Sequence, residues 1–340
     1  MHELWDAEPG YLNTASFGLP PRTAWKALQT ALNEWRGGST SWEHWADCVE
    51  QSRQTFARLV DVDPRRVSVG STVSAFAGLV AAALPDGAQV LVAESEFTSV
   101  VFPWAVHADR GVRVVEAPLE TLADRVTPET TLVAISAVQS SDGRTADLDG
   151  IRKATDSVGA WLVVDATQSV GWLPMAAGNY DAVFVSAYKW LMSPRGTAFA
   201  MWSPRLAERL RPLAAGWFAG AEVHESYYGM PLRLAADARR FDISPAWHNW
   251  VGTAAALDVV EKLGVDVIHD HDVGLANRFR SALDMPPGAS AIVAAQVPDA
   301  EDRLSRAGIR AATRAGSLRV SFHAYNTEAE VDRALDALAG

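Results

Sequence analysis

Short apolar runs alternate with longer amphipathic segments through the N-terminal part of the chain. Each run has the length of a β-strand, and a continuous apolar run is typical of a strand that is buried on both faces. The segments between the runs, such as residues 72–84, 149–157 and 204–210, have the length of helices. This alternation predicts an α/β fold in which helices cover a mainly parallel sheet. The expected strands are residues 89–93, 112–115, 132–136, 161–165, 182–186 and 197–202.

The pattern changes near Pro245, where a helix over residues 250–263 ends at Gly264 and shorter elements follow. These look like a compact α+β unit, with strands expected at residues 291–297, 308–312 and 318–322, and helices at residues 273–283 and from residue 327 onward. We therefore expect a large domain over residues 21–245 and a small C-terminal domain over residues 246–340. The N-terminal arm, residues 1–20, is expected to pack beside the small domain.

Charge and cysteine content narrow the range of partners. The formal net charge is −11, and Lys and Arg form no long run that could follow a phosphate backbone, so a nucleic acid is not expected as a partner. The N-terminus has no pattern of a signal sequence, and no apolar stretch approaches the length of a membrane span. The single cysteine, Cys48, excludes an intramolecular disulfide. We expect a cytoplasmic protein without a membrane partner.

An acid and a lysine lie at the carboxyl ends of two expected strands. In open α/β sheets that edge binds ligands. A cofactor aldehyde that stabilises carbanions needs a lysine, an acid beside its pyridine nitrogen, and donors for its phosphate. Lys189 and Asp165 can supply the first two, Ser186 can offer a hydroxyl to the phosphate, and Gln168 can reach the ring. The alternative is that Asp165 caps a helix and Lys189 is a solvated surface residue, but the apolar residues 190–192 are a poor setting for an idle ammonium group.

The segment "VDATQSVGWLPMAAGNYDAVFVSAYKWLMSPRGTAFAMW", residues 164–202, resembles the cofactor-binding core of the class V aminotransferase family. That family includes cysteine desulfurases, isopenicillin N epimerase and kynureninase. The resemblance implies the PLP-dependent transferase-like fold (fold type I), with a mainly parallel seven-stranded sheet, pyridoxal 5'-phosphate as the cofactor, and a homodimer. Four further segments resemble the family in the same order: "YLNTASFGLPP" from Tyr11, "VGSTVSAFAGLV" from Val69, "ESEFTSVVFPW" from Glu94 and "SLRVSFHAYNTEAEVDRAL" from Ser317.

The resemblance implies a role for each matching residue of the cofactor core. Lys189 would carry the cofactor as a Schiff base, Asp165 would pair with the pyridine nitrogen, and Gln168 would bind the phenolic oxygen. Ser71 and Thr72 would begin a helix, and their hydroxyls and the N–H groups of its first turn would hold the phosphate. Ser186 would be a further ligand of the phosphate. Ser244 would contact the phosphate of the neighbouring subunit, and of these residues it matches the family pattern least closely.

Two aromatic residues stand where many relatives have histidines. Phe97 would stack on the cofactor ring, and the Tyr188 hydroxyl would reach the phosphate. In the small domain, the resemblance implies that Arg319 is a bidentate clamp for the substrate α-carboxylate, whereas the alternative is an exposed arginine on an edge strand. Trp217 lies in a glycine-aromatic loop that relatives place near the substrate.

The first steps of the implied reaction serve several outcomes. Lys189, once freed by an incoming amino acid, would take the Cα proton. Return of a proton to the cofactor gives an aminotransferase, loss of a β-substituent gives a lyase, and return to Cα gives an epimerase. Aminotransferase is the outcome that we expect at family level. Residues 284–318 lack the cysteine that cysteine desulfurases place before the carboxylate-binding strand, which argues against that activity.

Two further features of the sequence bear on function. A non-catalytic binding protein on the same scaffold is an alternative from another class, although no G-x-G-x-x-G follows any expected strand. The segment His269, Asp270, His271, Asp272 contains metal-ligand residue types, but two histidines at i and i+2 do not share a helix face. We therefore expect no metal site.

Overall fold

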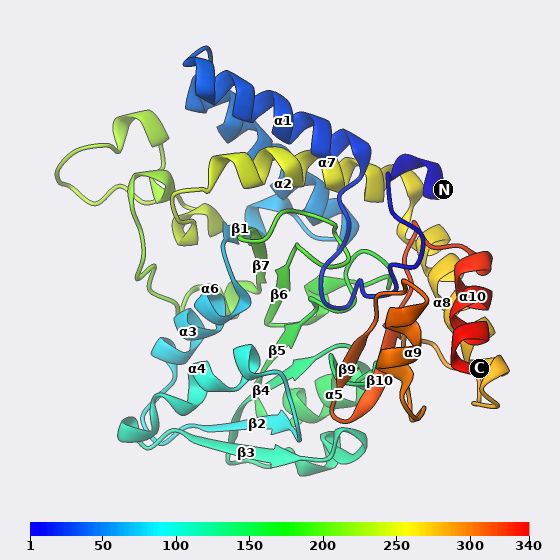
Figure 1. Cartoon of the computed structure of the whole chain (residues 1–340). Coiled ribbons are helices and arrows are strands. Elements are labelled where there is room, and N and C mark those ends of the chain that lie inside the picture. The colour runs from blue at the N-terminus through cyan, green and yellow to red at the C-terminus, as the bar shows by residue number, and fades with distance from the viewer. Residues whose placement is uncertain (340) are drawn as a thin grey trace.

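A seven-stranded sheet forms the centre of the computed structural model, which describes residues 1–339 (Figure 1). The strand order is β1-β7-β6-β5-β4-β2-β3, and the pairs from β6 through β3 are parallel. The prediction of a mainly parallel α/β sheet is therefore confirmed. The strands are β1 (Val67–Gly70), β2 (Gln89–Ala93), β3 (Arg113–Ala117), β4 (Thr130–Ser136), β5 (Trp161–Asp165), β6 (Ala182–Ser186) and β7 (Ala198–Trp202).

Two strands at one side of this sheet depart from the prediction. β7 runs antiparallel to both of its neighbours, because the loop 187–197 is too short for the crossover that a parallel pair requires. β1 is not among the expected strands. β1 lies at the edge of the sheet, yet its four residues are all buried. Ser68 and Gly70 interrupt the apolar run that would have indicated a buried strand.

Helices cover both faces of the sheet. Along β5, Leu162 and Val164 pack in a cluster with Phe56 of α2, whereas Val163 faces a second cluster that includes Phe76 of α3. Within residues 1–339, no helix has both the length and the apolar character needed to span a bilayer. The helices are α1 (Arg22–Gly37), α2 (Trp42–Leu59), α3 (Val73–Ala83), α4 (Phe102–Ala105), α5 (Leu148–Val158), α6 (Pro204–Ala207), α7 (Trp247–Leu263), α8 (Val265–Ala282), α9 (Ala300–Arg306) and α10 (Glu328–Ala339).

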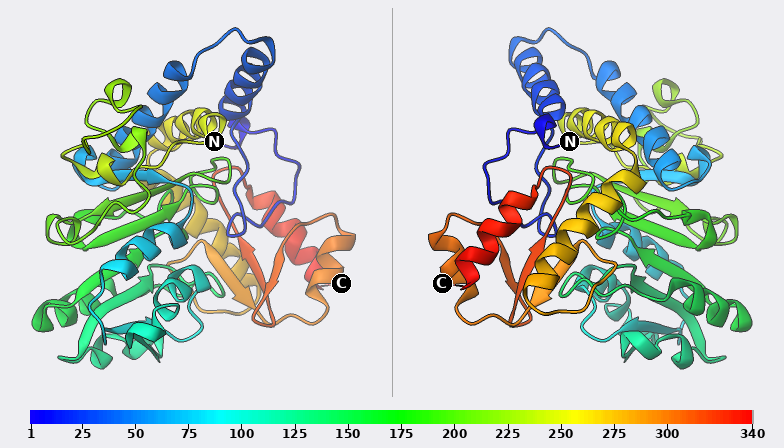
Figure 2. Two further views of the ribbon diagram at one scale, coloured as in Figure 1. Left: turned by 90° about the vertical axis from the view of Figure 1, so that its left-hand side faces the viewer. Right: turned by 90° about the vertical axis from the view of Figure 1, so that its right-hand side faces the viewer.

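A smaller antiparallel sheet lies beside the large one, in the order β8 (Ile292–Ala295), β10 (Ser317–Ser321), β9 (Ala312–Arg314) (Figure 2). The strand expected at residues 308–312 is wrong, because Gly308 takes a positive φ after α9 and Arg310 instead pairs with Tyr11 of the N-terminal arm. The arm also places Leu12 in the core of this small unit.

Helix α7 belongs by sequence to the segment 246–340 but packs against α1 and α2, where Val251 contacts Ala31 and Trp45. Figure 1 shows these three helices lying together at one end of the large sheet. The domain boundary at residue 245 stays a prediction.

Candidate active site

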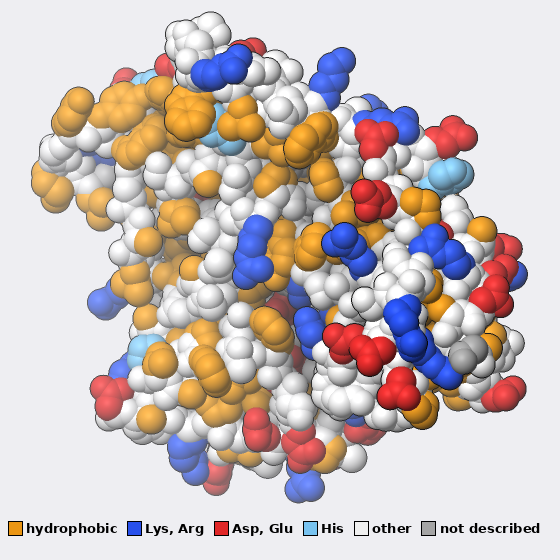
Figure 3. Space-filling view, viewed as in Figure 1, with side chains coloured by type: hydrophobic (Ala, Val, Ile, Leu, Met, Phe, Trp, Pro, Cys, Tyr) orange, Lys and Arg blue, Asp and Glu red, His pale blue; other side chains and the backbone are white. Residues whose placement is uncertain are grey.

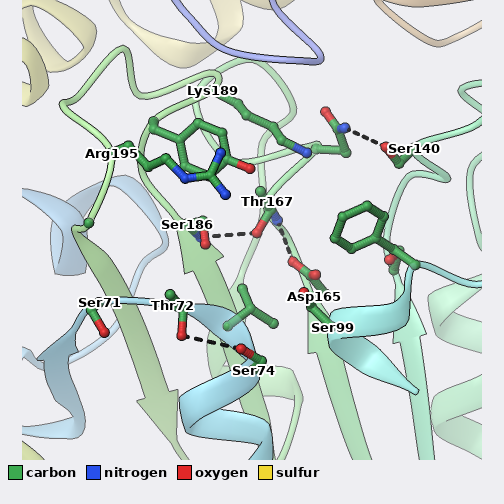
Figure 4. A pocket seen from close by; sticks show the side chains of 16 residues that line it. Ser71, Thr72, Ser74, Ser99, Ser140, Asp165, Thr167, Ser186, Lys189 and Arg195 are labelled. Atoms are coloured by element: carbon green, nitrogen blue, oxygen red, sulfur yellow. Dashed lines mark hydrogen bonds between the residues drawn. The ribbon is translucent and has the colours of Figure 1, made fainter. Parts of the chain in front are cut away.

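A cavity of about 270 Å³ opens at the carboxyl ends of β5 and β6, beside the N-terminus of α3 (Figure 4). This is the sheet edge at which ligands bind in α/β proteins. It brings together eight of the residues predicted from the sequence: Ser71, Thr72, Phe97, Asp165, Gln168, Ser186, Tyr188 and Lys189.

Lys189 lies in the loop 187–197 that follows β6, and it is only 6% exposed. Its Nζ lies 5.5 Å from the centroid of the Phe97 ring and 5.7 Å from that of Tyr188. Burial lowers the pKa of Lys189 from 10.5 to about 8, although the charge of Asp165 partly opposes this shift. A sizeable fraction of the amine is therefore neutral near pH 8, which is the form that attacks an aldehyde.

The N-terminal arm holds the backbone of this loop. The Gly18 N–H donates to the Tyr188 carbonyl at 2.8 Å. The approach is so close that a Cβ built on Gly18 would lie 2.0 Å from the Lys189 carbonyl oxygen. Only glycine fits at this contact.

Asp165 ends β5 and is buried under the cavity. Burial raises the pKa of Asp165 to about 6, while hydrogen bonds with Thr167 and the charge of Lys189 oppose the shift. The Thr167 N–H donates to Asp165 Oδ1 at 2.8 Å, and Thr167 Oγ1 accepts from the Ser186 N–H at 3.0 Å. Thr167 thus ties together the ends of β5 and β6, and Asp165 is ionised above about pH 6.

Gln168 is fixed by three hydrogen bonds. Its Nε2 donates to the Ala15 carbonyl and to Ser140 Oγ, both at 3.0 Å, and its Oε1 accepts from Trp190 Nε1 at 2.8 Å. The side chain therefore joins the N-terminal arm, the loop after β4 and the loop of Lys189.

Hydroxyl groups line the opposite end of the cavity. Thr72 caps α3 by accepting from the Ala75 N–H at 3.3 Å, so the first N–H groups of this helix face the cavity beside Ser71. Figure 4 shows Ser71, Thr72 and Ser74 at this end, with Ser186 above them. Free N–H groups and the helix dipole make such a place suited to an anion.

Phe97 is held by a buried carboxylate that the sequence analysis did not identify. Glu96 accepts hydrogen bonds from the Phe97 N–H at 2.8 Å, from the Ser136 N–H at 2.9 Å and from Gln139 Nε2 at 3.0 Å. The Phe97 ring is 46% exposed and lines the cavity, where a planar group could stack on it.

Arg319 lies on β10, the central strand of the small sheet, and is 1% exposed. The alternative of an exposed edge arginine is therefore wrong. Its Nη2 donates to Ser16 Oγ at 2.8 Å, its Nη1 to the Ser140 carbonyl, and its Nε has no hydrogen-bond partner among the described residues. Burial lowers the pKa of Arg319 to about 10, so it stays cationic at neutral pH. It reaches the cavity wall through Ser140, and the carboxylate clamp stays a prediction.

Trp217 and Ser244, like Arg319, are not among the residues that line the cavity of this chain. Trp217 belongs to an aromatic cluster in which its ring centroid lies 5.1 Å from that of Trp42 and 5.3 Å from that of Tyr227. Ser244 is exposed in the loop before α7. The geometry of a single chain gives neither residue a ligand, and their roles stay predictions.

Other lining residues were missed. Ser140 follows β4, so the same strand-end argument that identified Asp165 would have found it. Arg195 enters the cavity from the far end of the loop 187–197. Its place depends on the path of that loop, which the sequence pattern does not indicate.

A buried pair supports the loop from behind. His323 Nδ1 lies 2.8 Å from Asp272 Oδ2, and His323 Nε2 lies 3.0 Å from the Trp190 carbonyl oxygen. A carbonyl oxygen only accepts a hydrogen bond, so Nε2 is the donor in the contact with Trp190. The neighbouring His271 contacts the Asn326 carbonyl instead, so this histidine and Asp272 are directed to different partners.

A buried amine and a buried carboxylate at neighbouring strand ends, with a hydroxyl-lined helix N-terminus opposite, define a pyridoxal-phosphate enzyme of fold type I. The family described as aminotransferase class-V matches residues 15–305. The chain therefore belongs to the class V aminotransferase family, whose cofactor is pyridoxal 5'-phosphate.

Individual relatives agree with this assignment. The chain is 27% identical over 336 residues to an uncharacterized aminotransferase of Bacillus subtilis, with 92% of this chain and 89% of the relative covered. It is 28% identical over 340 residues to isopenicillin N epimerase of Streptomyces clavuligerus, with 85% and 84% covered. The solved structure of the cystine C-S lyase C-DES with its product cysteine persulfide has a TM-score of 0.88 at 20% identity, covering 98% of both chains, which shows a shared fold.

The cavity fits this cofactor chemically. Pyridoxal phosphate presents an aldehyde, a pyridine nitrogen and a phosphate. The cavity offers an amine with a lowered pKa at Lys189, a buried carboxylate at Asp165, and hydroxyls beside the α3 N-terminus. Each of these groups complements one group of the cofactor.

Proposed function

We propose that the protein acts on an α-amino acid, that Lys189 holds pyridoxal phosphate covalently, and that transamination is its reaction. The observation that carries the proposal is the buried Lys189 amine, with a pKa of about 8, in one cavity with the buried Asp165. Family membership supports the same assignment.

The bound cofactor supplies an electron sink for charge that develops at the substrate Cα. Asp165, ionised above about pH 6, would keep the pyridine nitrogen protonated. Lys189, in its neutral form, accepts the proton from Cα. Both N–H groups of Gln168 Nε2 donate within the protein, to Ala15 and Ser140, so its proposed contact with the phenolic oxygen would replace one of these hydrogen bonds. Phe97 would cover the ring.

Arg319 is proposed to bind the substrate α-carboxylate. Its guanidinium is buried beside the cavity and donates to neutral oxygen atoms of Ser16 and Ser140. A carboxylate makes stronger hydrogen bonds to a guanidinium than a hydroxyl or a carbonyl does, so a substrate would compete well for these donors. Fixing the carboxylate also fixes which Cα bond Lys189 can reach.

Transamination is favoured over two alternatives. The similarity to an uncharacterized aminotransferase of Bacillus subtilis supports it, while the similar identity to an isopenicillin N epimerase keeps epimerisation as an alternative. β-Elimination, including C–S lyase or kynureninase-like chemistry, is the other. Cys48, the one cysteine, lies on α2 outside the cavity lining, which argues against a desulfurase that uses an active-site thiol. A non-catalytic binding role would leave the buried Lys189 amine without a use.

We also propose a cytoplasmic homodimer. Large apolar side chains are exposed on the loop between α6 and α7: Leu213 is 65%, Tyr228 89% and Leu232 71% exposed. Figure 3 shows hydrophobic side chains gathered over this loop and the adjoining helices. A patch of this kind commonly marks a protein interface, and in such a dimer we propose that Ser244 contacts the phosphate in the cavity of the neighbouring subunit.

The test starts from apoprotein that is mixed with pyridoxal phosphate and then with a panel of amino acids. The wild type should develop a visible absorbance band that borohydride fixes to the chain, and Lys189→Ala should not. Lys153→Ala, on the exposed face of α5, is the matched control and should behave as the wild type. A borohydride-stable adduct in Lys189→Ala would refute the choice of lysine. Assays for keto acid, ammonia and sulfide then separate transamination from elimination.

A further inference from the structure

Arg195 occupies a defined place at the cavity. Its backbone carbonyl accepts a hydrogen bond from Asn249 Nδ2 of α7 at 2.8 Å, which anchors the end of the loop 187–197. The next residue, Gly196, has a φ of +102°, and a Cβ there would meet Asn249 Nδ2 at 2.9 Å. The path of the backbone at Arg195 is therefore fixed by a helix and by a glycine.

The side chain is directed by an aromatic ring. The guanidinium carbon of Arg195 lies 4.8 Å from the centroid of the Tyr188 ring, a cation–π contact. In Figure 4 the side chain extends into the cavity on the side of Ser186 and Thr72. Stacking on a ring face leaves the N–H donors at the edge of a guanidinium free to meet an acceptor.

The charge of Arg195 is not balanced by the protein. Within residues 1–339, no Asp or Glu carboxylate lies within ion-pair distance of its guanidinium, and none of its side-chain N–H groups has a hydrogen-bond acceptor. The cavity lining holds two basic side chains, Lys189 and Arg195, against one acidic side chain, Asp165. The lining thus carries an excess positive charge beside a set of hydroxyl donors, which complements an anion.

We propose that Arg195 is a ligand of the cofactor phosphate, and that Tyr188 acts as its stacking platform rather than as the main polar contact. A phosphate is a dianion that accepts two parallel N–H donors from a guanidinium. It would lie between Arg195, Ser186 and the α3 N-terminus. The proposal rests on the cofactor and not on which reaction follows, so it does not depend on transamination.

The test compares pyridoxal phosphate with pyridoxal, which lacks the phosphate, as ligands of the apoprotein. Arg195→Gln should weaken the affinity for pyridoxal phosphate by roughly 10- to 100-fold, as expected for a lost hydrogen bond to a charged group, and leave the affinity for pyridoxal nearly unchanged. Arg209→Gln, an exposed arginine on the surface, is the matched control and should change neither affinity. Equal losses for both ligands, or no loss for pyridoxal phosphate, would overturn the assignment.

A second readout uses inorganic phosphate and needs no covalent step. Phosphate should raise the melting temperature of Lys189→Ala apoprotein through preferential binding to the folded state, and adding Arg195→Gln should abolish that rise. This experiment distinguishes an incorrect assignment of the phosphate ligand from an incorrect assignment of the cofactor-binding lysine. Tyr188→Phe should keep the affinity, whereas Tyr188→Leu should lose roughly 2- to 5-fold with the stacking contact. If Arg195→Gln instead leaves phosphate binding intact and raises only the KM of dicarboxylic amino acids, Arg195 binds the substrate and the proposal is wrong.

Discussion

Burial shifts the two central ionisable groups of the site in opposite directions. The pKa of the Lys189 amine falls to about 8 and that of the Asp165 carboxyl rises to about 6, in each case because the charged form has lost water. Each charge partly stabilises the other. At neutral pH, Asp165 is ionised while Lys189 retains an accessible neutral fraction, and both states suit pyridoxal-phosphate chemistry.

The shift of Asp165 predicts a pH-dependent difference in stability. Its pKa in the folded apoprotein is about 6, above the ordinary 3.8, so the folded state binds this proton more tightly than the unfolded chain does. The resulting stabilisation is complete below about pH 4 and is lost as the pH rises to about 6. Asp165→Asn cannot titrate, so its free energy of unfolding should not show this loss. The difference between variant and wild type should therefore grow in favour of the variant, by up to about 3 kcal/mol, as the pH rises from about 4 to about 6. Urea unfolding of both apoproteins from pH 4 to 7 measures this, and parallel profiles would contradict it.

The buried Arg319 gives a second prediction at the same scale. Arg319→Lys keeps the positive charge but loses the planar fork, so we expect kcat/KM for the substrate to fall at least about tenfold. Absorbance of the bound cofactor should be unchanged, because the residues proposed to hold the phosphate lie elsewhere. Steady-state kinetics on the amino acid identified by the panel measure the effect. Wild-type kinetics in this variant would refute the proposed role of Arg319 as the carboxylate clamp.

At the scale of elements, the central strands are predictable because each is buried on both faces and reads as an apolar run. β1 was missed since Ser68 and Gly70 break its run, and the strand expected at residues 308–312 was misplaced because that segment pairs with the N-terminal arm. The site follows the same rule. Lys189, which comes directly after a strand, was found, whereas Arg195 depends on how a loop returns, which local sequence does not encode.

The contact between the N-terminal arm and the lysine loop gives a prediction at this scale. A methyl group at Gly18 would lie 2.0 Å from the Lys189 carbonyl oxygen, and backbone cannot yield as a side chain can. Gly18→Ala should therefore lower the free energy of unfolding by about 1–3 kcal/mol and slow the attachment of pyridoxal phosphate. Gly78→Ala in α3, where nothing lies within 4 Å, is the control and should be neutral or stabilising. Equal behaviour of the two variants would show that the arm does not position Lys189.

At the scale of the whole molecule, the exposed apolar loop predicts association. Light scattering at micromolar concentration should give a particle of twice the 36.6 kDa chain mass. Tyr228→Glu with Leu232→Glu should shift the protein toward the monomer, because both side chains are largely exposed in the single chain. Val267→Glu, at an exposed apolar residue on α8, is the control, and Figure 1 shows the label of this helix on the opposite side of the molecule from the loop. A monomer in the wild type would contradict the proposed dimer.

The reversed direction of β7 has a consequence for how this site can vary among relatives. Because β6 and β7 are antiparallel neighbours with Ser186 opposite Ala198, the loop 187–197 is the tip of a hairpin, and its two ends are held by one ladder. Lys189 and Arg195 both lie in this connecting loop, one toward each end. An insertion or deletion at the tip would change the spacing between both cations at once, whereas length changes in the other loops would leave it intact. A change in the length of this hairpin is therefore expected to displace the Lys189 amine and the Arg195 guanidinium together.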